Sequence, residues 1–118
     1  MNHSILREKS FHFAVRIARF CKKLKKTYRE FEISPQLFRS GTAPGALCRE
    51  AQYAESRLDF KHKLNIGLKE ANEADYWLDI IIETIPELNT EALSLKMDCK
   101  EIVAMLVSST KTLKNNPK

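Results

Sequence analysis

Glycine, proline and cysteine are all scarce in this sequence. Its 118 residues include only three glycines, four prolines and three cysteines, whereas hydrophobic residues make up 43% and charged residues 30%. This balance is typical of amphipathic helices and excludes both a disordered chain and a strand-rich sandwich. The length suits a single core, so we expect residues 1–118 to form one all-α domain.

The few cysteines and the lack of long apolar runs point to a reduced, aqueous environment. Cys21, Cys48 and Cys99 are far apart, odd in number and free of any Cys-x-x-Cys pair, which predicts neither a disulfide framework nor a zinc site. No run reaches the roughly 18 uncharged apolar residues that a membrane span needs. We therefore expect a soluble, cytoplasmic protein with no membrane association.

What the sequence has instead is heptad periodicity. Alternating steps of four and three place apolar residues on one edge of a long helix between residues 60 and 85. The members of this edge are Phe60, Leu64, Gly67, Ala71, Ala74, Leu78, Ile81 and Ile85. Ser56 and Asp59, three residues apart, predict a capping box that opens the helix. A helix cannot bury such an edge alone, so the pattern predicts a bundle.

Three more helices are expected around this one. The first covers residues 6–29. The fourth is expected to have Asn89 or Thr90 as its cap and to end before a polar tail, residues 114–118, that we expect to fray. The buried edge of the first helix is predicted to comprise Ala14, Ile17, Cys21, Leu24, Tyr28 and Phe31, widened by Leu6, Phe13 and Phe20.

The second helix is the irregular one. Ser34 is expected to cap it, but Gly41, Pro44 and Gly45 then fall within five residues. Pro44 lacks a backbone donor and crowds the preceding turn, so we expect a kink or a short break there. Because short links join the helices, the leading architecture is an antiparallel up-and-down four-helix bundle whose second helix is kinked near Pro44.

One outer face of the first helix is strongly basic. Residues 1–31 hold nine Lys or Arg against Glu8 and Glu30, a balance of +7 that exceeds the +5 of the whole chain. If Ala14 lies on the buried edge, six cations fall on the helical positions opposite the core: Arg16, Arg19, Lys22, Lys23, Lys26 and Arg29. Such a stripe is expected of a surface that binds the phosphate backbone of RNA or DNA. The alternative is a solvated helix face, and the lack of interleaved exposed aromatic residues argues against base stacking.

Motifs that would carry catalysis are missing. Glu70, Glu73 and Asp75 form an acidic cluster of a kind that can bind metal or exchange protons, but their helical positions diverge. The Glu-x-x-His motif of metal-binding bundles is absent, and neither a nucleophile arrangement nor a Gly-rich phosphate loop occurs. We therefore expect no metal, no cofactor and no enzymatic activity.

A second apolar set on the third helix predicts self-association. Ile66, Tyr76 and Ile80 point away from the buried edge, and Trp77 lies at its margin. Large apolar residues on an outer face indicate a subunit interface, so we expect a homo-oligomer. Scattered surface hydrophobic residues are the alternative explanation.

Most of the chain resembles a known bacterial family. The segment 36–82 contains Gln-Leu-x-Arg-Ser, Arg-Glu-Ala, Asp-Phe-x-x-Lys and Lys-Glu-Ala-x-Glu-x-x-Tyr-Trp-Leu. These motifs are similar to those of the four-helix-bundle proteins related to proteins encoded in intervening sequences of 23S rRNA genes. The first-helix signature of that family resembles Lys9, Ser10, Phe13, Ala14 and Ile17. The sequence departs from the family pattern at Ala43, Pro44 and Leu47, where Ser, Ile and Asn are usual.

The resemblance implies small ring-forming bundles, often pentamers, whose cellular role is unassigned. A similar fold serves as the accessory variability protein of diversity-generating retroelements, a basic pentamer that engages a reverse transcriptase and nucleic acid. The polar motif residues are expected to form ion pairs that fix the second helix against the third: Arg39, Ser40, Arg49, Glu50, Asp59, Lys63, Glu70 and Glu73.

Two functions remain open from the sequence. The leading hypothesis is a non-enzymatic oligomeric bundle that contacts nucleic acid, RNA in particular, through the basic face of its first helix. The alternative is a scaffold that binds another protein and does not bind nucleic acid.

Overall fold

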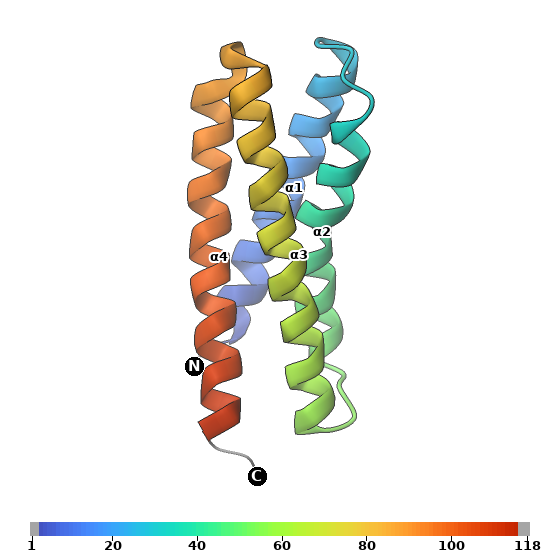
Figure 1. The fold of residues 1–118 in the computed structure, drawn as a ribbon. Helices are drawn as coiled ribbons and strands as arrows, with labels where there is room; N and C mark the ends of the chain where they lie inside the picture. The colour runs from blue at the N-terminus through green and yellow to red at the C-terminus, as the bar shows by residue number, and fades with distance from the viewer. Residues whose placement is uncertain (1–2, 116–118) are drawn as a thin grey trace.

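The protein is a bundle of four long helices (Figure 1). The computed structural model describes residues 3–115, with side chains up to residue 111. Its elements are α1 (His3–Lys26), α2 (Ile33–Ala51), α3 (Arg57–Thr84), the short 3-10 helix η1 (Pro86–Leu88) and α4 (Asn89–Asn115). No strand occurs in this part of the chain. The expected all-α, antiparallel up-and-down four-helix bundle is confirmed.

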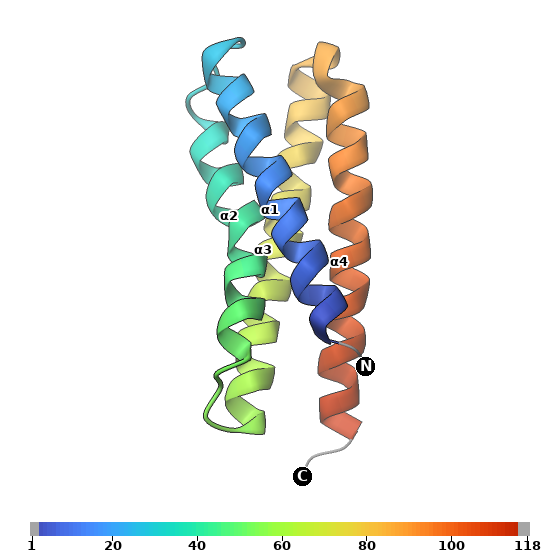
Figure 2. The same ribbon diagram turned by 180° about the vertical axis from the view of Figure 1, so that it is seen from behind.

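The bundle is elongated, 49 × 20 × 20 Å, and its helices pack in chain order. α1 contacts α4 less than it contacts α2. Figure 2 shows the reason, since α1 crosses obliquely from α4 near its N-terminus to α2 near its C-terminal end. None of the described helices is both long and apolar enough to span a membrane.

The buried edge of α3 matches the heptad prediction. Leu64, Gly67, Ala71, Ala74, Leu78 and Ile81 are buried, and the two end members, Phe60 and Ile85, are half-buried against the same core. Ser56 Oγ accepts a hydrogen bond from the Asp59 N–H at 3.0 Å, and the Asp59 carboxylate accepts one from the Glu55 N–H at 3.1 Å. The predicted capping box is therefore confirmed.

The predicted edge of α1 is wrong by one helical position. The residues of α1 that are buried form the heptad series Leu6, Ser10, Phe13, Ile17, Phe20 and Leu24, joined by Cys21. Ser10 interrupts the apolar pattern of this series, so the series could not be recognised in the sequence. The Ser10 hydroxyl donates a hydrogen bond to the Arg7 carbonyl at 3.1 Å, which satisfies it when buried. Ala14 and Tyr28 are only half-buried, and Phe31 is exposed beyond the end of the helix.

α2 also begins differently from the prediction. Ser34 lies inside the helix and is buried, and its hydroxyl donates to the Cys21 carbonyl at 3.2 Å, so it is not the cap. The Glu30 carboxylate takes that role by accepting from the N–H groups of Glu32, Ile33 and Ser34 at 3.1, 2.9 and 2.7 Å. A side chain before the helix thereby satisfies its orphan donors.

Of the kink or short break expected at 41–45, the break does not occur, because α2 is one continuous helix with Pro44 inside it. The two glycines instead mark a close approach of α1. A Cβ atom on Gly41 would lie 2.7 Å from Ile17 Cγ2, and one on Gly45 would lie 3.0 Å from the Ser10 carbonyl oxygen. This segment is therefore a helix-packing site.

The predicted cap of α4 at Asn89 is not formed. Asn89 Oδ1 is buried without a hydrogen-bond partner, so this side chain does not cap α4. α4 continues to Asn115, and the rest of the tail expected to fray lies outside the described residues.

All three cysteines are buried and free, and burial raises the pKa of Cys21 to about 11 and that of Cys99 to about 12. Their thiols stay protonated at neutral pH.

Candidate nucleic-acid interface

Three cations of α1 are paired with carboxylates of α4. The pairs are Lys9–Glu101, Arg16–Asp98 and Lys23–Glu91, with N–O distances of 2.9, 2.5 and 2.8 Å. The α1 members recur every seventh residue, so they form one column on the flank that faces α4. Arg16 also donates to Ser94 Oγ at 3.0 Å.

These pairs place two members of the predicted basic stripe beside α4. Because the buried edge of α1 is rotated from its predicted position, Arg16 and Lys23 do not lie opposite the core. The hydrogen bond to Glu91 raises the pKa of Lys23 above its ordinary value. Both charges are largely neutralised within the bundle, so they are poor candidates for contacts to phosphate.

The remaining cations of the stripe are exposed at the C-terminal end of α1. Arg19, Lys22, Lys26 and Arg29 make no ion pair with any side chain that the structure describes, and Lys25, which the stripe omitted, joins them. We call these five residues the basic cluster. Four of them lie in the last eight residues of α1 and Arg29 lies just beyond it, where the helix dipole favours positive charge.

An exposed aromatic residue adjoins the basic cluster. Phe31 is 54% exposed, and the guanidinium carbon of Arg29 lies 5.4 Å from the centroid of its ring. No exposed aromatic residue lies between the cations of the predicted stripe, because Phe20 is buried and Tyr28 is half-buried, but Phe31 lies directly beyond its end. Sequence reasoning missed Phe31 because it assigned this residue to the buried edge of α1, although Lys25 and Lys26 already mark the end of that helix.

The polar motif residues form one link between α2 and α3. Arg39 donates to both carboxylate oxygens of Glu70 at 2.8 and 2.9 Å, and also to Glu73. Trp77 Nε1 donates to Glu73 at 2.9 Å, and this bond, followed by that from Arg39, lowers the pKa of Glu73. This network ties the two helices together.

The other motif residues make contacts within one helix or toward α1. Lys63 pairs with Asp59 at 3.5 Å within α3, and the Ser40 hydroxyl donates to the Gln36 carbonyl at 2.9 Å within α2. Arg49 lies over the ring of Phe11 on α1, and Glu50 lines the same groove. These contacts do not join α2 to α3.

The four residues expected to form a subunit interface differ in exposure. Tyr76 is 56% exposed, whereas Ile66 and Ile80 are half-buried and Trp77 packs partly against the core. The rings of Tyr76 and Trp77 meet edge to face, with centroids 5.1 Å apart. Other exposed apolar residues went unnoticed in the sequence: Phe11, Phe38 and Tyr53 on or beside α1 and α2, and Leu93, Met97 and Val107 on α4.

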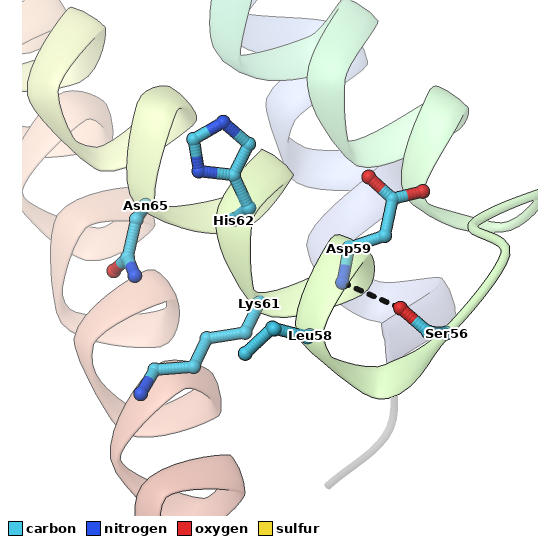
Figure 3. A pocket seen from close by; sticks show the side chains of 6 residues that line it. All are labelled: Ser56, Leu58, Asp59, Lys61, His62 and Asn65. Atoms are coloured by element: carbon cyan, nitrogen blue, oxygen red, sulfur yellow. Dashed lines mark hydrogen bonds between the residues drawn. The ribbon is translucent and has the colours of Figure 1, made fainter.

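A hollow of about 550 Å³ lies on the surface at the start of α3 (Figure 3). Its lining residues are Ser56, Leu58, Asp59, Lys61, His62 and Asn65. Their polar groups point in different directions, and the hydrogen bond between them is the cap of α3. Among the described residues no three His, Cys, Asp or Glu side chains are placed to hold a metal ion.

Fold and surface together define a class of small helical bundle with an ion-paired flank and an exposed basic end. The chain belongs to the 23S rRNA-intervening sequence protein family, whose model matches residues 2–108. The resemblance expected from the motifs is thus confirmed.

A solved structure supports the same assignment. It is a protein of unknown function from the S23 ribosomal protein family of Bacteroides thetaiotaomicron, and it is similar to this chain with a TM-score of 0.90 and 45% identity. The similarity covers 94% of this chain and 99% of the other. No curated protein matches the sequence. Family membership therefore establishes the fold and assigns neither an activity nor a ligand.

Proposed function

We propose that this bundle binds RNA through the basic cluster of Arg19, Lys22, Lys25, Lys26 and Arg29, without strong sequence preference. The observation that carries the proposal is the concentration of exposed cations without ion pairs at one end of α1. Flexible ammonium and guanidinium groups on a convex helix face suit contacts to a phosphate backbone, which carry affinity but no sequence information.

The distribution of ion pairs supports this assignment. Every carboxylate in a described ion pair lies on α3 or α4: Asp59, Glu70, Glu73, Asp75, Asp79, Glu91, Asp98 and Glu101. Of the nine Lys and Arg in residues 1–31, three are in those pairs, which leaves six against Glu8 and Glu30. The Glu30 carboxylate is turned toward the backbone of α2. The exposed Glu32 is the other carboxylate in this link, so the five cations of the basic cluster keep an excess of three positive charges over Glu30 and Glu32.

Charge reversal within the basic cluster tests the proposal. The double variant Lys22→Glu, Lys26→Glu should weaken binding to a fluorescent single-stranded RNA about tenfold or more at low salt. The matched control is Lys69→Glu, Lys100→Glu, which changes the net charge of the protein by the same amount. Lys69 of α3 and Lys100 of α4 are exposed and form no ion pair within the described residues. The proposal fails if the wild-type protein does not bind at low salt, or if both double variants lose the same affinity.

We also propose that copies of the chain associate through the α3 face of Ile66, Tyr76, Trp77 and Ile80, as the pentamer that the family resemblance implies. Exposure of the Tyr76 ring beside Trp77 supports this face, because paired aromatic residues are enriched at interfaces. Light scattering at micromolar concentration should give a mass several times the 13.6 kDa of one chain. A monomer mass would contradict the proposal, and loss of association in Tyr76→Lys would support the assigned face.

A scaffold that binds another protein is the second candidate function. It is favoured by Leu93, Met97 and Val107, which are exposed along the outer face of α4. Replacing Met97 with Lys separates the two functions, because it should abolish binding of a protein partner and leave the affinity for RNA unchanged.

A further inference from the structure

We infer that Arg29 and Phe31 form a stacking site for an unpaired nucleobase, so that the bundle prefers single-stranded RNA to duplex RNA. This inference rests on the proposed function and names the kind of nucleic acid that the basic cluster serves. It depends on three observations: the exposure of an Arg–Phe pair, the backbone conformation of Arg29, and the hydrogen bonds that hold the link between α1 and α2.

The Arg–Phe pair offers surfaces that a base can stack on. The Phe31 ring is 54% exposed, and the Arg29 guanidinium lies over it at 5.4 Å from the centroid. Unpaired bases stack both on aromatic rings and on guanidinium planes. Arg29 has no carboxylate partner within the described structure, so its charge remains available to an adjacent phosphate.

The conformation of Arg29 is one that glycine normally adopts. Its φ of 55° makes it the one non-glycine residue with positive φ in the part of the chain that the structure describes. The position follows the end of α1, where a left-handed residue commonly terminates a helix and glycine carries no steric penalty. Helix termination alone would favour glycine there, so an arginine at this position carries a conformational cost that glycine would not.

Hydrogen bonds on both sides hold the pair in place before any ligand binds. The Glu30 N–H donates to the Leu24 carbonyl at 2.9 Å, which closes the end of α1. The Glu30 side chain caps α2 through three backbone N–H groups. The backbone on both sides of Phe31 is therefore fixed, so it loses little conformational entropy when a base stacks on the ring.

The position of the pair selects single strands. Lys26 ends α1 three residues before Arg29, so the pair directly follows the basic cluster in the chain and is within reach of a strand whose phosphates contact that cluster. Bases within a duplex are already stacked on their neighbours and cannot reach the ring without unpairing, whereas those of a single strand are free to do so.

A second Arg–Phe pair provides a matched control. Arg49 lies 5.5 Å from the ring centroid of Phe11, which is 50% exposed in a groove of about 420 Å³ between α1 and α2. It equals the first pair in residue types and in the exposure of its ring, but Phe11 lies in the first half of α1, away from the lysines at the C-terminal end of that helix.

The test compares an oligouridine of about six nucleotides, its abasic counterpart with the same phosphates, and a duplex of equal length. Phe31→Ala should weaken oligouridine binding about 5- to 150-fold and leave binding of the abasic strand unchanged. Phe11→Ala should change neither affinity. Circular dichroism checks the helix content of each variant, which should be unaltered because both rings are exposed.

A spectroscopic readout tests stacking independently of affinity. In the Phe31→Trp variant, oligouridine should quench the new indole, whereas the abasic strand should not, with the wild-type signal of Trp77 as the reference. The inference is overturned if Phe31→Ala affects neither strand or weakens both equally, or if the duplex binds as tightly as oligouridine. If the wild-type protein binds none of the three at low salt, the proposed function fails as well.

Discussion

Two Gly→Ala substitutions should change stability in opposite directions, although both glycines are buried in mid-helix. Gly67 of α3 has room for a methyl group, because an added Cβ would come no closer than 3.8 Å to any neighbour. Gly41 of α2 has none, because its Cβ would lie 2.7 and 2.8 Å from Cγ2 and Cγ1 of Ile17. Ile17 is fully buried and cannot swing into solvent.

The size of each change in the free energy of unfolding is set by two opposing effects, helix propensity and steric overlap. Alanine is favoured over glycine in a helix by about 1 kcal/mol, which should stabilise Gly67→Ala by about 0.5–1 kcal/mol. At position 41 the same gain is opposed by overlap, since carbon atoms normally approach to about 3.5–4.0 Å and overpacking a core costs about 1–3 kcal/mol. Gly41→Ala should therefore be less stable than Gly67→Ala by about 1–3 kcal/mol.

Urea denaturation of both variants, at one protein concentration so that self-association does not bias the comparison, measures this difference. A double-mutant cycle identifies its source. In an Ile17→Ala background the overlaps with Cγ2 and Cγ1 are gone and a contact of 3.2 Å with Cβ remains. Gly41→Ala should therefore cost less stability there than in the wild-type protein. If Gly41→Ala stabilises the wild-type protein as much as Gly67→Ala does, α1 and α2 do not pack closely at Gly41 and Ile17.

Three further predictions concern the cap, the acidic link and the thiols. Glu30→Ala removes the cap of α2 and should lower the free energy of unfolding by about 1 kcal/mol in urea titration. The lowered pKa of Glu73 means that its contribution to stability is complete above the ordinary value of 4.5 and is lost as the pH falls through the folded-state value. Fluorescence of Trp77 during acid titration should follow this loss, and Glu73→Gln should remove that component. Because the pKa of Cys21 is about 11 and that of Cys99 about 12, neither thiol should react with iodoacetamide at pH 8 until the protein is unfolded.

The sequence was sufficient where local rules and tertiary packing agree. The edge of α3 contains only apolar residues and glycine at its heptad positions, so its pattern could be read directly. The cap at Ser56 depends on two residues three positions apart and on little else. The family motifs likewise required no knowledge of the fold.

Prediction failed where a local signal was ambiguous. Ser10 occupies a buried heptad position of α1, but it is polar, so the apolar pattern in the sequence indicated Ala14 instead. The buried edge predicted from Ala14 included Phe31, which is in fact exposed. In α2, Pro44 and two glycines resemble a helix breaker, but packing of α1 and α3 on both sides outweighs the loss of one backbone hydrogen bond.

The basic stripe shows a different limit of sequence reasoning. Charge counting could find the excess of cations in residues 1–31, but it could not show that Arg16 and Lys23 meet carboxylates 82 and 68 residues further along the chain. Ion pairs between distant segments depend on the rotation of each helix in the bundle. The structure therefore narrows the candidate surface to one end of α1.

The salt dependence of RNA binding tests the central claim most directly. If roughly four cations of the basic cluster contact phosphates of a single strand, a plot of log affinity against log salt should have a slope of about −3. For Lys22→Glu, Lys26→Glu the slope should be shallower by at least about 1, whereas Lys69→Glu, Lys100→Glu should keep the wild-type slope. A wild-type slope near zero, or the same slope in all three proteins, would contradict binding through this end of α1.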